Sequence, residues 1–212
     1  MSSIQLAYSA YTLFNVEILE EQKAITVDSI AGNALLSEDL LLLIEGCRKK
    51  DRRSQKALYD RFAPMLYSRI RRYVTEQSEV NELLNETFFK ILTHLDSYSF
   101  SGAFEGWMHR IAMNTITDFL RRHIKHKQRI VADTEDVHCT VPENVLAGIG
   151  YKELLLLIHG LPEVHRGVFN LFVFDNCSHK EIAEHLGITE ANSRWHLNDA
   201  RRRLKEKLDA LR

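Results

Sequence analysis

The chain has 212 residues, of which 45% are hydrophobic and 27% charged, and its formal net charge is −1. This length suits one or two globular domains, and the balanced charge excludes a protein that binds nucleic acid through a uniformly basic surface. No apolar run is long enough to span a bilayer and no signal peptide is recognisable, so we expect a cytoplasmic protein without membrane insertion. The cysteines Cys47, Cys139 and Cys177 are odd in number and lack paired spacing, which suits a reducing compartment.

Four helices are predicted between residues 36 and 123, because apolar residues recur there at spacings of three and four. They cover about residues 37–47, 54–73, 78–92 and 104–123. Pro64 lies within the second helix and should bend or break it. Residues 1–35 lack a clear period, so we predict only an N-terminal extension without an assigned structure.

Periodicity is lost over residues 124–142, which we predict to be a linker, and a second helical unit follows at residues 143–212. Its first buried run is residues 154–158. Gly160 ends that helix and Pro162 starts the next. We therefore expect an all-α fold of two small helical domains, residues 36–123 and 143–212, joined by the linker.

The second unit ends in the pattern of a helix-turn-helix. Ser178 and Glu181 form a capping box, Gly187 supplies the left-handed residue that ends the helix, and Thr189 can cap the next helix. Such a unit places its second helix in the major groove of DNA. The alternative is an ordinary helical hairpin with a solvated basic tail. The residues predicted to face inward are Ser193, Leu197, Ala200, Leu204 and Leu208.

Three sequence motifs precede or join this unit. ELLNETF lies at residues 82–88, FEGWMHRIAMNTITDFLRR at 104–122 and LPEVHR at 161–166. In this order and spacing, together with the helix-turn-helix, they resemble the bacterial RNA polymerase sigma factors of the extracytoplasmic-function class, over about residues 36–210. The resemblance implies a factor that binds core RNA polymerase and directs it to promoter DNA, with no enzymatic activity of its own and an anti-sigma factor as a further partner. It also implies that the first domain melts and reads the minus-ten element and that the second reads the minus-thirty-five element as duplex.

An acidic face of the third predicted helix is the candidate for binding the polymerase. Spacings of three and four put its members on one side of the helix, where an acidic surface suits a basic partner. By resemblance, this face docks on the clamp helices of the largest polymerase subunit. Asn85 stands where the family usually has Gln, and the alternative is an ordinary solvated face. The residues are Glu79, Glu82, Asn85 and Glu86.

The fourth predicted helix and the loop before it are the candidate for reading the minus-ten element. Arg and Asn side chains can bond phosphates and base edges, and exposed aromatic rings can stack on an extruded base. The alternative for Tyr98 and Phe100 is packing within the domain, and packing is the favoured interpretation for Trp107. The residues are Tyr98, Phe100, Arg110, Asn114, Arg121, Arg122 and Lys125.

The last predicted helix is the candidate for reading the minus-thirty-five element. The inward stripe sends Trp195 to the opposite side, so we expect Trp195 to be substantially exposed unless another segment covers it. Ser193 and Trp195 both depart from the usual family residues. The candidate contacts are Thr189, Asn192, Arg194, Trp195, His196, Arg201 and Arg202.

Histidines and cysteines near the linker and in the second unit raise the question of a zinc site. Their spacings match no standard finger or ribbon, so we predict no metal and no cofactor. Two alternative functions stay open on the residues alone: a helix-turn-helix transcriptional regulator, and a sigma-like interaction protein that has lost promoter recognition. The residues of the zinc question are His138, Cys139, Cys177, His179 and His185.

Overall fold

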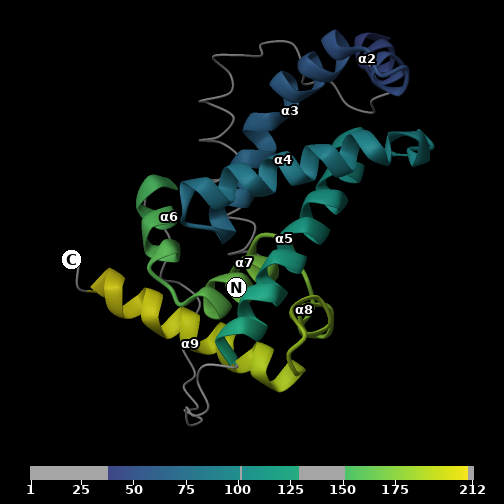
Figure 1. The fold of residues 1–212 in the computed structure, drawn as a ribbon. Helices are drawn as coiled ribbons and strands as arrows, with labels where there is room; N and C mark the ends of the chain where they lie inside the picture. The colour runs from purple at the N-terminus through teal and green to yellow at the C-terminus, as the bar shows by residue number, and fades with distance from the viewer. Residues whose placement is uncertain (1–37, 101, 129–150, 210–212) are drawn as a thin grey trace. The chain divides into compact units, whose positions relative to one another are not determined.

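The computed structural model describes residues 38–100, 102–128 and 151–209. All regular structure in these ranges is helical, which confirms the all-α prediction (Figure 1). The chain divides into two compact units, with the boundary between Phe119 and Leu120. The predicted N-terminal extension, most of the predicted linker and the start of the second predicted domain lie outside the described residues.

The first unit is built from helices that bury one face each against their neighbours. Helix α2 packs on α3, α3 packs on α4, and the short helix η1 contacts α2 and α4. Leu58, Leu66 and Ile91 are fully buried at these contacts. The elements are α2 (Glu38–Arg48), α3 (Arg52–Tyr73), α4 (Gln77–Thr93), η1 (Leu95–Ser97) and α5 (Phe104–Gln128), which continues into the second unit.

Helix α3 runs without interruption through Pro64, so of the bend or break predicted at this residue, the break is wrong. A proline inside a helix costs about 3 kcal/mol because it removes one backbone donor and crowds the preceding turn. Leu58 and Phe62 before the proline and Leu66 and Ile70 after it are all buried. Each such side chain contributes about 1.5–3 kcal/mol on burial, which outweighs the cost.

Helix α5 extends to Gln128, so the prediction that the linker begins at residue 124 is wrong. Ile116, Leu120 and Ile124 are buried at spacings of four, and the apolar period therefore continues past His123. The basic residues around Ile124 obscured this period in the sequence. As a consequence, Lys125 lies on the same helix as the motif that precedes it.

The second unit contains the predicted helix-turn-helix. Ser178 and Glu181 form both bonds of a capping box, and Gly187 has φ 68° and ψ 36°, the left-handed conformation that ends the helix. The Thr189 hydroxyl oxygen accepts from the Asn192 N–H at 3.1 Å and caps the last helix. The five residues of the predicted inward stripe are all buried. The elements are α6 (Tyr151–His159), α7 (Glu163–Val173), α8 (His179–Leu186) and α9 (Glu190–Asp209).

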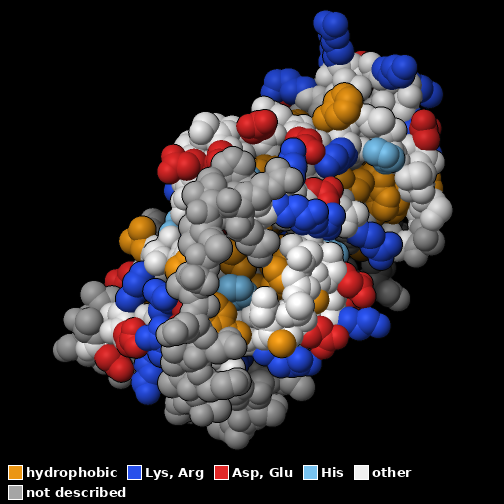
Figure 2. Space-filling model, turned by 60° about the horizontal axis from the view of Figure 1, so that its bottom comes forward, with side chains coloured by type: hydrophobic (Ala, Val, Ile, Leu, Met, Phe, Trp, Pro, Cys, Tyr) orange, Lys and Arg blue, Asp and Glu red, His pale blue; other side chains and the backbone are white. Residues whose placement is uncertain are grey.

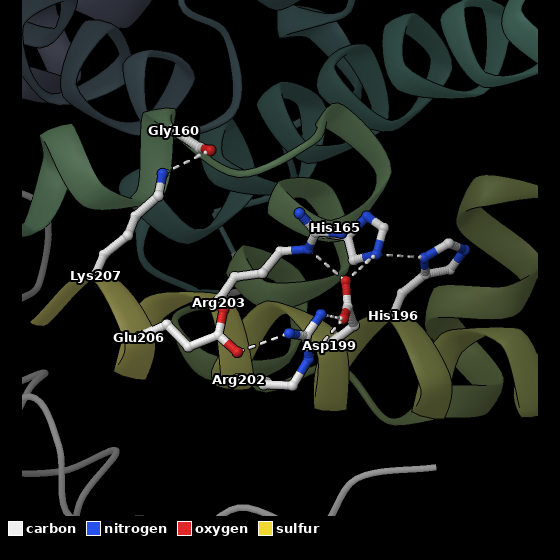
Figure 3. A network of polar contacts seen from close by, with 8 residues as sticks. All are labelled: Gly160, His165, His196, Asp199, Arg202, Arg203, Glu206 and Lys207. Atoms are coloured by element: carbon white, nitrogen blue, oxygen red, sulfur yellow. Dashed lines mark hydrogen bonds and ion pairs between the residues drawn. The ribbon is translucent and has the colours of Figure 1, made fainter. Parts of the chain in front are cut away.

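Two cations bind the carbonyl groups at the end of α6. The buried Arg166 donates through Nη1 to the carbonyl oxygens of His159 and Leu161, at 3.2 and 3.1 Å. Lys207 on α9 donates to the carbonyl oxygen of Gly160 at 2.9 Å (Figure 3). The last carbonyl groups of a helix have no hydrogen-bond donor within the helix, and these side chains supply one. The same bonds connect α6 to α7 and α9.

Some large apolar side chains remain at the surface. Figure 2 shows hydrophobic side chains reaching the displayed surface in patches between charged ones. Leu156 is 71% exposed, so only one side of the predicted buried run in α6 faces the core. The exposed residues of this kind among those described are Leu41, Leu42, Tyr59, Phe89, Phe100 and Leu156.

Candidate functional site

The polar face of α4 carries the four residues predicted to bind a partner protein. Glu82 and Asn85 are exposed, whereas Glu79 and Glu86 are half-buried. Glu86 pairs with Lys90 one turn later, at 2.7 Å. Glu82 is therefore the exposed acid nearest the centre of this face.

Phe89 extends the same face of α4, and the sequence analysis missed it. Its side chain is 70% exposed and lies one heptad after Glu82, so the two share one side of the helix. The signal was the apolar period of α4, because Leu84, Phe88 and Ile91 recur at spacings of four and three and Phe89 falls outside this stripe. Phe88 is buried, which leaves Phe89 as a large apolar side chain in solvent beside the acids.

A polar stripe runs along α5 on the side opposite its buried residues. Arg110, Asn114, Arg122 and Lys125 are exposed, and Arg121 is half-buried. Buried Met108, Ala112 and Ile116 fix the phase of this stripe at helical spacing. The helix thus presents several hydrogen-bond donors and positive charges along one side, as binding to a nucleic-acid backbone requires.

The loop before α5 is an aromatic cluster, and the prediction of Tyr98 as a base-stacking residue is wrong. Tyr98 is only 4% exposed, and its ring centroid lies 5.0 Å from Phe100, 5.1 Å from Phe104 and 5.4 Å from Trp107. Its hydroxyl donates to the carbonyl oxygen of Gly102, and burial raises the pKa of Tyr98. Tyr98 therefore supports the loop from inside, and Trp107 packs in the same cluster, as one of the alternatives held.

Phe100 is the ring of this cluster that reaches solvent. It is 39% exposed and has φ 58°, a left-handed conformation that bulky residues rarely adopt. The guanidinium carbon of Arg48, from α2, lies 4.8 Å from the centre of the Phe100 ring. Such strained residues persist only where their surroundings hold them, and they gather at functional sites.

The start of the recognition helix α9 exposes three of the predicted contact residues. Thr189, Asn192 and Arg194 are exposed at the first turn. Thr189 is engaged as the helix cap, and Arg194 pairs with Glu190 at 2.9 Å. Asn192 and Arg194 thus project side chains from the end of the helix that enters the groove in this class of motif.

Asp199 organises the middle of α9 (Figure 3). Its carboxylate accepts from Arg202 Nε at 3.1 Å, from Arg203 Nε at 2.6 Å and from His165 Nε2, on α7, at 2.9 Å. Burial raises the pKa of Asp199, but the bonds from Arg203 and Arg202 outweigh it and hold that pKa below its usual range. Arg202 also pairs with Glu206 at 2.7 Å, so its charge is held by two acids of its own helix.

The predicted exposure of Trp195 is wrong, and His196, a predicted contact residue, is partly covered. His196 is half-buried, and its Nδ1 lies 3.4 Å from Nε2 of His165. Trp195 is half-buried against both imidazoles, with ring centroids 5.3 Å from His165 and 4.8 Å from His196. The predicted rotation of α9 is right, since Ser193 is fully buried. However, His165 of α7 covers part of the side of α9 that was predicted to face solvent.

Arg201 lies on the other flank of α9. It is half-buried, and its guanidinium carbon is 5.6 Å from the centre of the Phe172 ring. This contact leaves the cation near the surface while its apolar stem covers the domain core. Arg201 therefore carries its positive charge in the middle of α9, beyond the exposed start of the helix.

Comparison with known proteins decides between the alternatives. The family model for Sigma-70 region 2 matches residues 58–125, and that for Sigma-70 region 4 matches residues 151–204. The RNA polymerase sigma factor SigZ of Bacillus subtilis (strain 168) is 31% identical over 152 residues, which is 72% of this chain and 85% of SigZ. The chain belongs to the RNA polymerase sigma factors of the extracytoplasmic-function class.

A second curated relative agrees with this assignment. The sigma-E factor of Escherichia coli (strain K12) is 28% identical over 194 residues, which is 83% of this sigma factor and 98% of that protein. A solved structure of the sigma factor RpoE in complex with the anti-sigma factor NepR, from Bartonella quintana, is 17% identical, with a TM-score of 0.44, and covers 74% of this chain and 98% of that one. A sigma factor binds core RNA polymerase and directs promoter recognition and melting. The α4 face and the α5 stripe lie inside the region 2 match, and the seven α9 candidates lie inside the region 4 match.

Within the described part of this sigma factor, no group of three or more His, Cys, Asp or Glu side chains is arranged to hold a metal ion. His138 and Cys139 lie outside the described residues. None of the described helices combines the length and the apolar character needed to cross a membrane.

The paired histidines of region four make its stability depend on pH. Burial lowers the pKa of His196 to about 4, and burial also lowers the pKa of His165. A group whose pKa is lower in the folded than in the unfolded state stabilises the fold only while it is neutral. This contribution is complete above the ordinary histidine value of 6.5 and is lost as pH falls from there toward about 4.

We expect region four to lose roughly 1–2 kcal/mol of unfolding free energy between about pH 7.5 and pH 4.5 through these histidines, allowing for partial exposure. Urea unfolding followed by Trp195 fluorescence, in the Trp107→Phe background, measures it. His196→Gln should reduce the pH dependence, and His94→Gln, a matched change in the other unit, should leave it unchanged. An identical pH dependence with and without His196 contradicts the prediction.

Proposed function

We propose that this sigma factor divides its work among three surfaces. The polar face of α4 binds core polymerase, the α5 stripe with Phe100 reads and melts the minus-ten element, and the start of α9 reads the minus-thirty-five element as duplex. The observation that carries the proposal is the combination of the exposed α5 stripe and the capped helix-turn-helix in one chain. A simple helix-turn-helix regulator accounts for the second feature and leaves the first unexplained.

The polymerase surface consists of Glu79, Glu82, Asn85 and Glu86, and we add Phe89 to it. Acidic side chains suit a basic partner helix and orient its approach. An exposed aromatic ring amid such charges has the character of an interface anchor, because its burial on docking supplies affinity that exposed charges do not.

The minus-ten surface combines a cationic track with a stacking ring. Arg110 and Asn114 stand nearest the loop and can bond base edges, while Arg121, Arg122 and Lys125 follow along the helix toward the phosphate backbone. Phe100 supplies the ring on which an extruded base stacks. The positive charge lowers the cost of holding a separated strand, because it replaces condensed counterions.

The minus-thirty-five surface begins at the cap of α9. Thr189 fixes the helix start, and Asn192 and Arg194 reach base edges or phosphates from it. Trp195 contributes its remaining exposed edge to an apolar contact, such as a thymine methyl group. Arg201 adds positive charge further along the helix, and Arg202 reaches the DNA backbone only by exchanging its ion pair with Glu206, the more exposed of its two acids, for a phosphate.

The partners follow from these surfaces. They are core RNA polymerase, promoter DNA and, as membership of the class implies, an anti-sigma factor. Since the polymerase carries out RNA synthesis, we propose that this chain is not an enzyme and needs no cofactor. Its place of action is the cytoplasm, where bacterial polymerase and promoters are found.

The direct test of the proposal is binding to purified core polymerase. Tagged full-length chain should retain core polymerase on a resin, and an excess of another sigma factor should displace it. A chain that retains no core polymerase while keeping native circular dichroism would sink the proposal.

Trp195 gives a test of the minus-thirty-five surface. In Trp107→Phe, where Trp195 alone reports, acrylamide should quench the fluorescence partially, because the ring is half-buried. A duplex with a minus-thirty-five element can be selected from a random-sequence library with wild-type holoenzyme. Adding this duplex should reduce the quenching, because it covers the exposed edge of Trp195. A scrambled duplex at the same concentration is the control, and equal quenching with both duplexes counts against the contact.

A further inference from the structure

We propose that Arg48 is a positioning residue for the loop that reads the minus-ten element, because it holds the Phe100 ring in place for stacking. The inference rests on the proposed function of that loop. Arg48 ends helix α2, far from the loop in sequence, and belongs to none of the motifs that carry the family resemblance. Its side chain is nevertheless directed entirely at residues 95–100 and at its own helix.

Hydrogen bonds from Arg48 fix the backbone on both sides of η1. Its Nη2 donates to the carbonyl oxygen of Tyr98 at 2.8 Å and to that of Leu95 at 3.3 Å. A planar guanidinium can serve two acceptors and a ring at once, which a lysine ammonium cannot do in the same geometry. The path of the chain into Phe100 is therefore set by Arg48.

The same guanidinium covers one side of the Phe100 ring. Its carbon lies 4.8 Å from the ring centre, and the Tyr98 ring lies 5.0 Å away, tilted by 57°. Phe100 is thus bordered by a cation and a buried aromatic while part of it stays in solvent. Its left-handed backbone needs such outside support, since the conformation is unfavourable for a bulky side chain.

The charge of Arg48 is already matched inside the protein. Nη1 bonds Glu45 at 3.1 Å, and Nε lies 3.8 Å from Asp96. The two terminal nitrogens are engaged with a carboxylate and two carbonyls, and Nε is buried without a hydrogen-bond partner, so the guanidinium has little left to offer a phosphate. Arg48 therefore acts through Phe100 and not as a ligand of DNA, which separates it from the cations of the α5 stripe.

The test uses holoenzymes assembled from core polymerase and each variant, with labelled single-stranded oligonucleotides carrying a minus-ten element selected by the wild type. Removing the extruded base, by an abasic substitution at its position, should weaken wild-type binding about tenfold, as loss of one base–aromatic stack does. Arg48→Lys should bind the intact strand about tenfold more weakly and show little further loss on the abasic strand. Lys49→Met, at the exposed neighbouring position, is the control and should match the wild type, although it removes a charge that Arg48→Lys keeps.

Phe100→Leu leaves Arg48 in place and should reproduce the defect, and the double variant should be no worse than Phe100→Leu alone, since both changes remove one interaction. A normal abasic penalty in Arg48→Lys, or in Phe100→Leu, overturns the inference. If Arg48→Lys weakens binding to the intact and the abasic strand by the same factor relative to the wild type, the inference also fails, because a ligand of the DNA backbone behaves in this way. A wild-type holoenzyme that binds no minus-ten strand refutes the proposed function itself, which distinguishes that failure from this one.

Discussion

Glu82→Lys combined with Glu86→Lys is expected to abolish binding to core polymerase while leaving the fold intact. Glu82 is exposed, and Glu86 is half-buried and pairs with Lys90. Reversing both charges places like charges against a basic partner helix, which costs several kcal/mol at an interface and weakens binding roughly 100-fold or more. Within the helix, the lost pair with Lys90 costs only about 0.2–0.5 kcal/mol, so the variant should still fold. A titration of labelled protein with core polymerase, together with circular dichroism, measures both effects.

Glu76→Lys is the matched control for this charge reversal. Glu76 is exposed at the N-cap of α4, makes no capping bond with its side chain and lies off the proposed docking surface. It should bind core polymerase within about twofold of the wild type, a change of ~0.4 kcal/mol. If the double variant binds as well as Glu76→Lys, the α4 face does not dock on polymerase.

Arg110→Ala and Asn114→Ala are expected to impair promoter melting while sparing duplex binding by region four. Both residues are exposed on the α5 stripe, and neither contributes to the buried side of the helix. A contact to a base or phosphate is worth about 1–3 kcal/mol, so each variant should reduce the open-complex population roughly tenfold. Permanganate footprinting detects this as a loss of reactive thymines in the minus-ten region.

The control for the α5 variants is Arg53→Ala, which removes an exposed arginine from α3, on the same domain but off the stripe. It should melt the promoter as the wild type does. Duplex binding by region four, measured with a minus-thirty-five fragment, should be the same for all three variants. Normal melting by Arg110→Ala and Asn114→Ala would remove the stripe from the mechanism.

The sequence predicts well what depends on spacing along one helix. The inward stripe from Ser193 to Leu208 is buried as predicted. In the helix before it, the capping box forms at the first turn and Gly187 ends the helix, also as predicted. These features are local, since each is set by bonds or contacts within four residues. The α5 stripe follows from the same rule, because the buried period of α5 fixes which side is left for polar residues.

What the sequence did not predict is contact between elements. Tyr98 is buried because Phe104 and Trp107 of α5 close over it, and His196 turns toward α7 because His165 lies there. Arg48 escaped notice for the same reason, since a residue at the end of α2 has no local signal for reaching residues 95–100. Periodicity assigns a side of a helix but not the neighbour that covers it.

Run-off transcription with purified core polymerase tests the central claim most directly, namely that one chain both recruits polymerase and selects a promoter. Core polymerase with this chain, on a library of genomic fragments from the source organism, should produce transcripts from defined start sites that are absent with core polymerase alone. The same start sites should weaken in Arg110→Ala and disappear in the Glu82→Lys, Glu86→Lys double variant. Transcription that is no more specific than that of core polymerase alone would contradict the account, and would favour an interaction protein that keeps the sigma fold without promoter recognition.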